Sequence, residues 1–479
     1  MTDTYDLIVI GAGPVGENVA DYAVKRGLTA AIVESELVGG ECSYWACMPS
    51  KALLRSGAAL EAARRVPGAA EAITAQLDVA AVLKRRDEIV SDYDDGGQVE
   101  WLESAEIDLH RGFGRITGPK RVSVTAADGT VTELTANFAV AVSTGTAALL
   151  PDIPGLADVQ PWTSREATGV TEVPESLVVI GGGVVASEMA TAFASFGTTV
   201  TVVARGGLLS TMEPFAGELV GAALEKAGAV LKLGVSPTSA RREADGSVVI
   251  ELDDGSSVTA EQVLVATGRT PRTGDLGLAS VGLEDGDWIA VDETLLATAD
   301  TNKDDPWLYA VGDVNHRALL THQGKYQARA AGEVIAARAQ DRTVDDAPWG
   351  LHVATADNEA VPQVTFTDPE VASIGLTEKA AKKAGYDIRT VDYDIASVSG
   401  AHVAAEGYAG RARIIVDEAR KVLIGATFVG QDVAELLHSA TIAVVGEVPL
   451  DRLWHAVPSY PTISEVWLRL LETYGRPDA

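Results

Sequence analysis

The chain has 479 residues, of which 47% are hydrophobic and 5% aromatic, a composition ordinary for a multidomain α/β protein with ample core. Its formal net charge of -30 at pH 7 disfavours binding to nucleic acid or to an anionic membrane surface. We therefore expect small molecules and other proteins as partners, no nucleic acid and no membrane. The amino terminus shows no basic segment followed by an apolar core, so we expect a cytoplasmic location.

A strand, a glycine turn and a helix are predicted over residues 5–25. The turn has the pattern GxGxxG, which is typical of dinucleotide-binding folds when it joins a strand to a helix. Gly11 allows the tight turn, Gly13 lets the backbone approach a pyrophosphate, and Gly16 permits close helix packing. The next strand ends at Glu34, whose carboxylate can accept hydrogen bonds from ribose hydroxyls. These residues predict a first dinucleotide site.

The two cysteines of the chain, Cys42 and Cys47, follow this unit and have only four residues between them. A chain that uses cysteine nowhere else does not use it as a stabilising framework, so the pair is a candidate catalytic thiol couple. Taken alone, the pair could equally be two inert cysteines that pack as small hydrophobic residues.

A second strand-turn-helix pattern starts with a strand at 177–180. Gly181, Gly183 and Ala186 form a GxGxxA variant of the dinucleotide motif, which predicts a second nucleotide site. The strand that follows ends beside Arg205, where a carboxylate would be expected for NADH. Because an arginine can pair with a 2′-phosphate, it favours NADPH. Arg205 could instead be a solvated surface residue, and NADH remains open.

Two later segments, 263–269 and 307–313, place small residues at strand ends where a cofactor could approach. Asp313 follows Gly312 at such a strand end and could accept a hydrogen bond from a ribityl hydroxyl. We also assign four further small residues to cofactor binding, namely Gly40, Thr144, Gly145 and Gly268.

Residues 39–51 read GGECSYWACMPSK and resemble the GGxCxxxxCxPSK active-site segment of the FAD-dependent pyridine nucleotide-disulfide oxidoreductases. This is the family of dihydrolipoamide dehydrogenase, glutathione reductase and mercuric reductase, and the resemblance covers essentially the whole chain. It implies an α/β fold with two Rossmann-like domains, for FAD and NAD(P), plus an α+β dimerisation domain. The implied segments are an FAD-binding domain at 1–150 and 275–345, an NAD(P)-binding domain at 151–274 and a dimerisation domain at 346–479.

The resemblance also implies roles for single residues and a homodimer with shared active sites. Cys42 would be the interchange thiol that faces the substrate and Cys47 the thiol that faces the flavin. Both would need lowered pKa values, because the thiolate is the nucleophile in disulfide exchange. Lys51 and Glu188 resemble the family's ion pair near the flavin, and a plain surface salt bridge is the alternative. Trp45 could narrow the substrate side or be a core residue.

The carboxyl-terminal segment departs from the family pattern. The disulfide-reducing members carry a His-Pro-Thr sequence followed by a glutamate, whereas this chain has Tyr460 in place of the histidine and retains Glu465. Tyrosine titrates near 10, so its ionisation at pH 7 costs roughly 4 kcal/mol, and Tyr460 is a poor base. His455 lies five residues earlier and does not align with the catalytic position. Tyr460 could simply pack at the dimer interface.

The leading hypothesis is a flavin-dependent oxidoreductase that passes electrons from NADPH or NADH through FAD and the Cys42-Cys47 disulfide to a small acceptor, for example an atypical disulfide. One alternative is an NAD(P)H:quinone or dye oxidoreductase with direct transfer from the flavin. Another is a flavoprotein subunit of a larger complex. Reduction of mercuric ion is disfavoured because the chain has no cysteines near its carboxyl terminus, and no metal site is expected.

Overall fold

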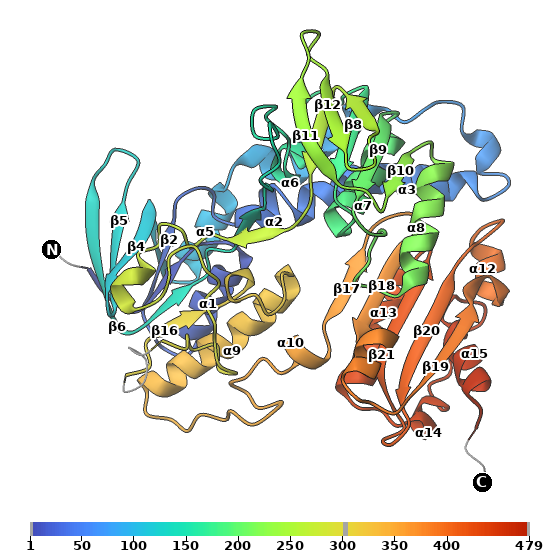
Figure 1. Cartoon of the computed structure of the whole chain (residues 1–479). Coiled ribbons are helices and arrows are strands. Elements are labelled where there is room, and N and C mark those ends of the chain that lie inside the picture. The colour runs from blue at the N-terminus through green and yellow to red at the C-terminus, as the bar shows by residue number, and fades with distance from the viewer. Residues whose placement is uncertain (1–2, 300–304, 477–479) are drawn as a thin grey trace. The chain divides into compact units, whose positions relative to one another are not determined.

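The computed structural model describes residues 3–299 and 305–476. The chain forms two compact units, each assembled from three stretches of sequence (Figure 1). The first unit contains Met1–Pro49, Asp87–Ala147 and Arg269–Asn358, and the second contains Ser50–Arg86, Ala148–Gly268 and Glu359–Ala479. The predicted segments 1–150, 151–274, 275–345 and 346–479 stay a prediction.

The first unit is built on one sheet with the strand order β3-β2-β1-β6-β5-β4, and β16 pairs with β6. β1, β2, β3, β6 and β16 are parallel, whereas β4 and β5 form an antiparallel extension. The strands are β1 (Asp3–Ile10), β2 (Ala30–Glu34), β3 (Ile107–Arg111), β4 (Phe113–Gly118), β5 (Arg121–Thr125), β6 (Val131–Val142) and β16 (Leu308–Ala310). A short pair, β7 (Thr146–Ala148) with β15 (Arg269–Pro271), lies off this sheet.

Helices complete the first unit, and three of them, α3, α4 and α10, include residues of both units. The helices are α1 (Pro14–Val24), α2 (Gly40–Tyr44), α3 (Cys47–Arg64), α4 (Val79–Ile89), α5 (Gly96–Ser104), α9 (Thr321–Ala339) and α10 (Ala356–Glu359). Short 3₁₀ turns occupy Ser91–Tyr93, Leu278–Val281 and Asp313–Asn315. α1 packs along α9 against the sheet (Figure 1).

The central strand β1 shows why this sheet needs cover on both faces. Successive side chains of a strand point to opposite faces, so Leu7 and Val9 join one hydrophobic cluster while Ile8 joins another. A strand that is apolar on both faces is typical of a parallel sheet with cover on each side. The apolar run that predicted this strand is therefore explained by its central position.

The second unit contains a parallel sheet of order β10-β9-β8-β14 and an antiparallel sheet of order β11-β12-β13. The strands are β8 (Ser176–Ile180), β9 (Thr199–Ala204), β10 (Val230–Leu233), β11 (Pro237–Arg242), β12 (Val248–Leu252), β13 (Ser257–Ala260) and β14 (Gln262–Val265). Their helices are α6 (Ser164–Thr168), α7 (Val184–Ser195) and α8 (Pro214–Lys226), and a 3₁₀ turn occupies Ala70–Ala72.

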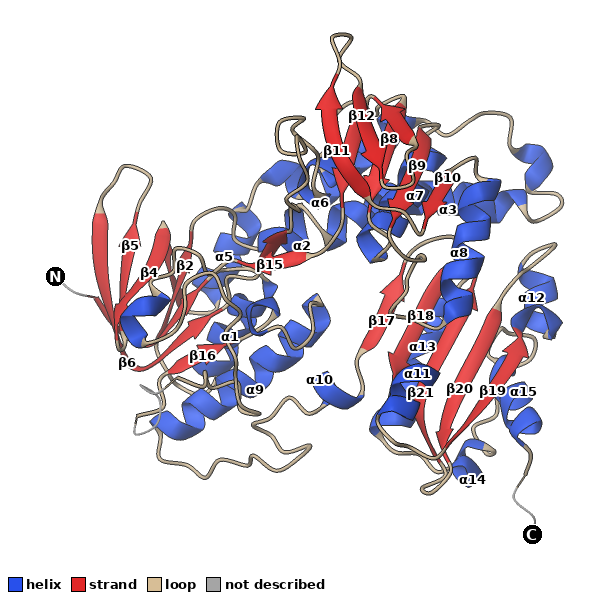
Figure 2. Ribbon diagram, in the orientation of Figure 1, coloured by secondary structure: helices blue, strands red, loops and turns tan. Residues whose placement is uncertain are grey.

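The carboxyl-terminal part of the second unit is an antiparallel sheet of order β17-β18-β21-β20-β19, with α13 packed on β18 and β21 (Figure 2). The strands are β17 (Pro362–Thr365), β18 (Glu370–Gly375), β19 (Ile388–Asp394), β20 (Arg411–Asp417) and β21 (Val422–Gly430). The helices are α11 (Glu378–Lys383), α12 (Ser399–Ala404), α13 (Val433–Val445), α14 (Leu450–Leu453) and α15 (Glu465–Tyr474), with a 3₁₀ turn at Ile395–Ser397.

The predicted fold class is confirmed: both strand-turn-helix units form, and an α+β region closes the chain. Of the helices that the structure describes, none combines the length and apolar character needed to cross a membrane.

Candidate active site

A cavity of about 400 Å³ in the first unit opens at the glycine turn between β1 and α1. The turn is tight: a Cβ at Gly16 would lie 1.9 Å from the carbonyl oxygen of Gly11, so only glycine fits there. Gly13 caps the amino terminus of α1 and faces open space, and Pro14 takes the first helical position. Backbone N–H groups at such a helix start favour an anionic ligand such as a pyrophosphate.

Many residues assigned to cofactor binding from the sequence line this one cavity. They are Gly11, Gly13, Glu34, Gly40, Thr144, Gly145 and Asp313, and Cys42 lines it as well. The structure therefore brings together residues from five separate parts of the first unit.

The Glu34 carboxylate is held in place at the end of β2. Its Oε2 accepts a hydrogen bond of 2.8 Å from the backbone N–H of Ala12, and its Oε1 accepts one of 2.7 Å from that of Glu36. A carboxylate fixed in this way has lone pairs left for ribose hydroxyls.

Polar atoms in the cavity wall support the fit of a dinucleotide. The side-chain hydroxyls of Ser143 and Thr144 are buried and have no hydrogen-bond partner among the described residues. Buried polar groups are normally satisfied, so these two hydroxyls point to a ligand with donors or acceptors of its own. Together with the glycine turn and Glu34, they fit FAD.

Asp313 lies at the other end of the cavity, where β16 ends. The Oγ1 of Thr146 donates a hydrogen bond of 2.7 Å to its carboxylate. Burial raises the pKa of Asp313, and this bond and the charge of Arg269 act in the opposite direction. The backbone N–H of Gly312 donates to Gln327 at 2.7 Å and fixes the turn.

The two thiols lie at the junction of α2 and α3. Both cysteines are free, and Cys42 is hydrogen-bonded to Cys47. The Cys47 Sγ lies 3.3 Å from the Oγ1 of Thr321, the first residue of α9. The two thiols are therefore close enough for thiol-disulfide chemistry. This contact disfavours the alternative of two inert cysteines that pack as small hydrophobic residues.

The expectation that both thiols have lowered pKa values is wrong for Cys42. Its pKa is raised, first by the hydrogen bond with Cys47, then by burial and by the negative charge of Cys47. The hydrogen bond with Thr321 and the charge of Lys325 act in the opposite direction. Cys42 therefore holds its proton more tightly than an isolated thiol does, because two neighbouring thiols cannot both ionise easily.

Lys51 and Glu188 form the predicted ion pair within the second unit. The Lys51 Nζ lies 2.7 Å from Oε2 of Glu188, which is only 3% exposed. The Oε1 of Glu188 accepts a hydrogen bond of 2.9 Å from the backbone N–H of Phe366, whose ring lies 4.9 Å from the ammonium. The burial of Glu188 distinguishes the pair from an ordinary surface salt bridge.

The second glycine turn joins β8 to α7 and resembles the first in its backbone geometry. Gly183 caps α7 and Ala186 is fully buried. A Cβ at Gly181 would lie 2.3 Å from the carbonyl oxygen of Ala266. Arg205 is exposed just beyond β9, and Gly268 follows β14.

The carboxyl-terminal residues lie in the second unit. Tyr460 is 76% exposed, and His455 is exposed as well. Glu465 is 7% exposed at the start of α15, where its Oε2 accepts a hydrogen bond of 3.0 Å from the backbone N–H of Gly400. Their part in a shared active site stays a prediction.

Trp45 is half-buried and packs among aromatic rings. Its ring centroid lies 5.6 Å from that of Tyr44 and 6.4 Å from that of Tyr93. The role of Trp45 at the substrate side stays a prediction.

Sequence reasoning missed four polar residues around the thiols and the cavity, namely Glu17, Thr146, Thr321 and Lys325. Thr321 had a signal, because a helix that starts soon after the Gly312-Asp313 turn brings its first residues to the same strand ends. Glu17 also had one, since a residue directly after the GxGxxG motif lies in the first turn of the helix that packs on the sheet.

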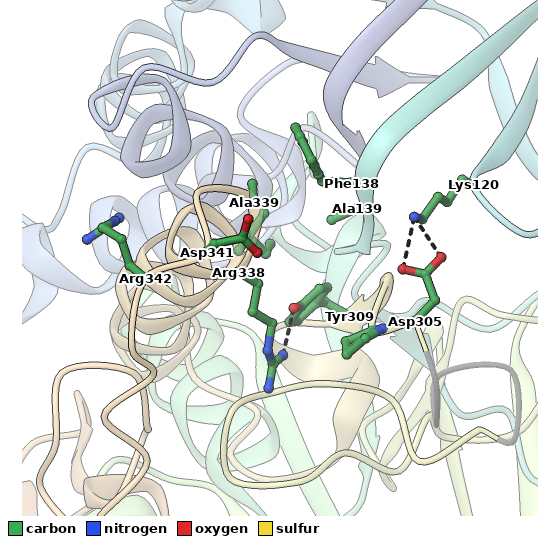
Figure 3. A pocket seen from close by; sticks show the side chains of 11 residues that line it. Lys120, Phe138, Ala139, Asp305, Tyr309, Arg338, Ala339, Asp341 and Arg342 are labelled. Carbon is green, nitrogen blue, oxygen red and sulfur yellow. Dashed lines mark hydrogen bonds and ion pairs between the residues drawn. The ribbon is translucent and has the colours of Figure 1, made fainter.

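Two other cavities lack these features. Figure 3 shows one of about 420 Å³ in the first unit, where Arg338 donates to the Tyr309 hydroxyl at 2.7 Å and Lys120 lies 2.7 Å from Asp305. A cavity of about 770 Å³ in the second unit is lined by parts of α3, α7 and α8. Neither contains a thiol or a glycine turn, and no group of His, Cys, Asp or Glu in the described ranges could hold a metal ion.

A dinucleotide cavity with a dithiol at its edge defines a flavin-dependent disulfide oxidoreductase, and the comparisons with known proteins agree. The chain belongs to the pyridine nucleotide-disulphide oxidoreductase family: the family model matches residues 5–333, and the family's dimerisation domain matches residues 361–470. The predicted family and enzyme class are therefore confirmed, with FAD and NAD(P) as the cofactors typical of the family.

Known relatives span nearly the whole chain. Mercuric reductase of Staphylococcus aureus is 32% identical over 465 residues, which cover 96% of this chain and 81% of the relative. Dihydrolipoyl dehydrogenase of Thermus scotoductus is 31% identical over 471 residues, which cover 96% of this chain and 95% of the relative. The Cu(II) complex of the HOCl-induced flavoprotein disulfide reductase RclA from Escherichia coli has the same fold, with a TM-score of 0.82, 22% identity and coverage of 98% of this chain and 99% of that chain.

Proposed function

We propose that the protein is a homodimeric FAD enzyme that passes electrons from NADPH through the Cys42-Cys47 couple to a small disulfide. The observation that carries this proposal is the hydrogen-bonded pair of thiols beside the dinucleotide cavity. The residues that would hold FAD are those of the glycine turn, Glu34, Thr144 and Asp313. When bound, FAD would supply the two-electron couple that links nicotinamide to the thiols.

The protein's own chemistry is disulfide exchange. Once ionised, Cys42 attacks a sulfur of the acceptor, which forms a mixed disulfide and releases one thiolate. Cys47 then attacks the sulfur of Cys42, which re-forms the internal disulfide and releases the second thiolate. Because the pKa of Cys42 is raised, its proton must be removed before the first step.

Two finer features rest on single observations. Arg205 is exposed at the end of β9 and no carboxylate stands there, which favours NADPH over NADH. Tyr460 and Val457 are 76% and 85% exposed in the carboxyl-terminal segment, which suits a surface that a second copy covers in the homodimer. A cytoplasmic location stays a prediction.

A quinone or dye is the second candidate acceptor, and Tyr460 is the observation that favours it. A quinone that takes electrons directly from the reduced cofactor needs no acid-base group at the thiols, and the family's histidine position holds tyrosine here.

The Cys42→Ser variant of the holoenzyme separates the two acceptors. We expect turnover with small disulfides such as lipoamide or oxidised glutathione to fall at least about 10³-fold, because the attacking nucleophile is lost. Rapid reduction of the bound cofactor by NADPH should be retained. Ser43→Ala, which keeps both thiols, is the matched control and should retain turnover.

Undiminished turnover in Cys42→Ser would contradict the relay through thiols and support direct transfer to a quinone. Anaerobic titration with NADPH gives a second readout. A long-wavelength absorbance band should appear in the wild-type protein and be absent in Cys47→Ser.

A further inference from the structure

Glu17 is a buried carboxylate that the exchange chemistry above does not use. It follows Gly16 in the first turn of α1 and is only 7% exposed. Its Oε1 is buried and makes no hydrogen bond to any residue that the structure describes. An unsatisfied buried carboxylate is costly, so its retention requires an explanation.

The packing of α9 on α1 brings a cation to Glu17. The helices approach closely at Gly324, where a Cβ would lie 2.5 Å from the Cγ2 of Val15. Lys325 follows Gly324. The pKa values of Glu17 and Cys42 are both raised, and the positive charge of Lys325 partly offsets each rise. Thr321, one turn earlier on α9, contacts Cys47. The first turns of α9 therefore connect the thiol pair with Glu17.

Three ionisable groups face Glu17 from the elements around it. Burial raises the pKa of Glu17 to about 7, the charge of Glu34 on β2 adds to this, and Lys325 on α9 opposes it. On α2, burial raises the pKa of Tyr44 to about 12, helped by the charges of Asp95 and Glu17. The charges that act on Glu17 are therefore one anion, Glu34, and one cation, Lys325, which stabilises its carboxylate.

On the basis of the proposed function, we propose that Glu17 is a positioning residue that acts on Cys42 through Lys325. The Lys325 ammonium stabilises either the Cys42 thiolate or the Glu17 carboxylate, and the two negative charges compete for it. The net change is proton loss from the Cys42 thiol and proton gain by the Glu17 carboxylate, while Lys325 stays charged. Atoms and charge balance without any further reactant.

This coupling makes the ionisation of Cys42 depend on the charge of Glu17, because protonation of Glu17 frees Lys325 to stabilise the Cys42 thiolate. A carboxyl that titrates near 7 takes up and releases its proton in the pH range where disulfide exchange operates. Glu17 and Lys325 lie in the same unit as both thiols, so the coupling needs no residue from elsewhere.

The test measures how fast iodoacetamide alkylates Cys42 between pH 5.5 and 9 in the FAD-loaded protein. A Cys47→Ser background leaves Cys42 as the only thiol of the chain. With Glu17 present, the logarithm of the rate should rise less steeply around pH 7, where Glu17 ionises and withdraws Lys325. Glu17→Gln should remove this flattening and raise the rate at pH 8 about tenfold, equivalent to one unit of pKa.

Lys325→Gln supplies the second arm, because this half-exposed side chain can be replaced without a core cavity. Lys325→Gln should slow alkylation about tenfold. Adding Glu17→Gln should not change the rate further, because Glu17 acts on Cys42 only through the Lys325 charge. Asp21→Asn, which removes a carboxylate on α1 that pairs with Lys25, is the matched control and should leave the profile unchanged.

The proposal is overturned if Glu17→Gln and Asp21→Asn give the same profile, or if Glu17→Gln has its full effect in the absence of Lys325. Alkylation requires no electron acceptor, so this outcome is distinct from a failure of the proposed function, which the Cys42→Ser turnover reports separately.

Discussion

The two strand-turn-helix motifs have the same backbone pattern, and each buries a glutamate in its helix, but the two glutamates have different partners. Glu17 follows the first glycine motif on α1, and Glu188 follows the second on α7. They are 7% and 3% exposed, so both carboxylates are removed from water. Their partners differ. Glu188 has the Lys51 ammonium at 2.7 Å and a backbone N–H, whereas the Oε1 of Glu17 has no hydrogen-bond partner in the described parts of the chain.

This difference teaches what a buried carboxylate can be used for. A carboxylate with a close cation and a hydrogen bond is a fixed charge that holds neighbouring segments in place. Glu17, whose Oε1 has no hydrogen-bond partner among the described residues, has a pKa raised by burial to about 7, so its charge changes near neutral pH. The first unit therefore contains a buried carboxylate that titrates, and the second unit contains an ion pair with a buried carboxylate.

The largest expected effect concerns Glu17 and pH. Its pKa is raised from 4.5 to about 7, so its contribution to stability is fully present below pH 4.5 and is lost as pH rises through 7. The loss amounts to about 3 kcal/mol at 1.36 kcal/mol per unit of pKa. Glu17→Gln should remove this dependence and be more stable than the wild type at pH 8. The urea midpoint from pH 4.5 to 8.5 measures the difference between the two proteins.

Asp21→Asn is again the control, since Asp21 lies on the same helix and pairs with the exposed Lys25. Parallel curves for the wild type and Glu17→Gln would show that Glu17 does not titrate in this range, and the contrast with Glu188 would then disappear.

A smaller effect of opposite sign is expected at Glu188. Glu188→Gln leaves the Lys51 ammonium without its anion and weakens the hydrogen bond to Phe366. Removal of one partner of a buried pair costs 3–5 kcal/mol, and because the Lys51 side chain is 36% exposed and can be hydrated, we expect about 2 kcal/mol. Urea midpoints at pH 8 should therefore fall for Glu188→Gln and rise for Glu17→Gln.

The companion variant Lys51→Gln makes the test specific to the pair. If Lys51 and Glu188 stabilise each other, the double variant should lose less than the sum of the two single losses. Strict additivity would mean that the contact contributes nothing, and that Glu188 matters only for its hydrogen bond to Phe366.

The sequence predicted well what short segments determine. Gly11, Gly13 and Glu34, which the glycine motif placed at one nucleotide site, line one cavity because a strand, a tight turn and a helix fix their geometry locally. That they bind a cofactor stays a prediction. The Lys51–Glu188 contact joins residues 137 positions apart, and only the family resemblance suggested it.

The charges around the thiols could not be predicted in this way. The approach of Lys325 to Glu17 depends on how α9 packs on α1, across some 300 residues of sequence, and no local pattern encodes it. The raised pKa of Cys42 depends on its distance from Cys47, which decides that only one of two neighbouring thiols ionises easily. Motifs predict where groups lie along the chain, whereas their ionisation depends on packing.

The smallest expected effect concerns the end of the second strand in each dinucleotide motif. The residue there is Glu34 at the end of β2 and Arg205 just after β9. Glu34 is held by two backbone hydrogen bonds, whereas Arg205 is exposed and, in the proposed function, would contact the 2′-phosphate of a bound nucleotide. An exposed ion pair contributes at most about 1 kcal/mol, and a bidentate contact to phosphate somewhat more. Arg205→Ala should therefore lower kcat/KM for NADPH about fivefold to tenfold and leave that for NADH unchanged.

Arg241→Ala is the control. It removes the same charge from the antiparallel sheet of the second unit, so a general loss of electrostatic attraction would affect both variants equally. A selective loss in Arg205→Ala that shrinks as salt is added would assign the 2′-phosphate to Arg205, and an unchanged ratio of the two nucleotides would remove the argument for NADPH.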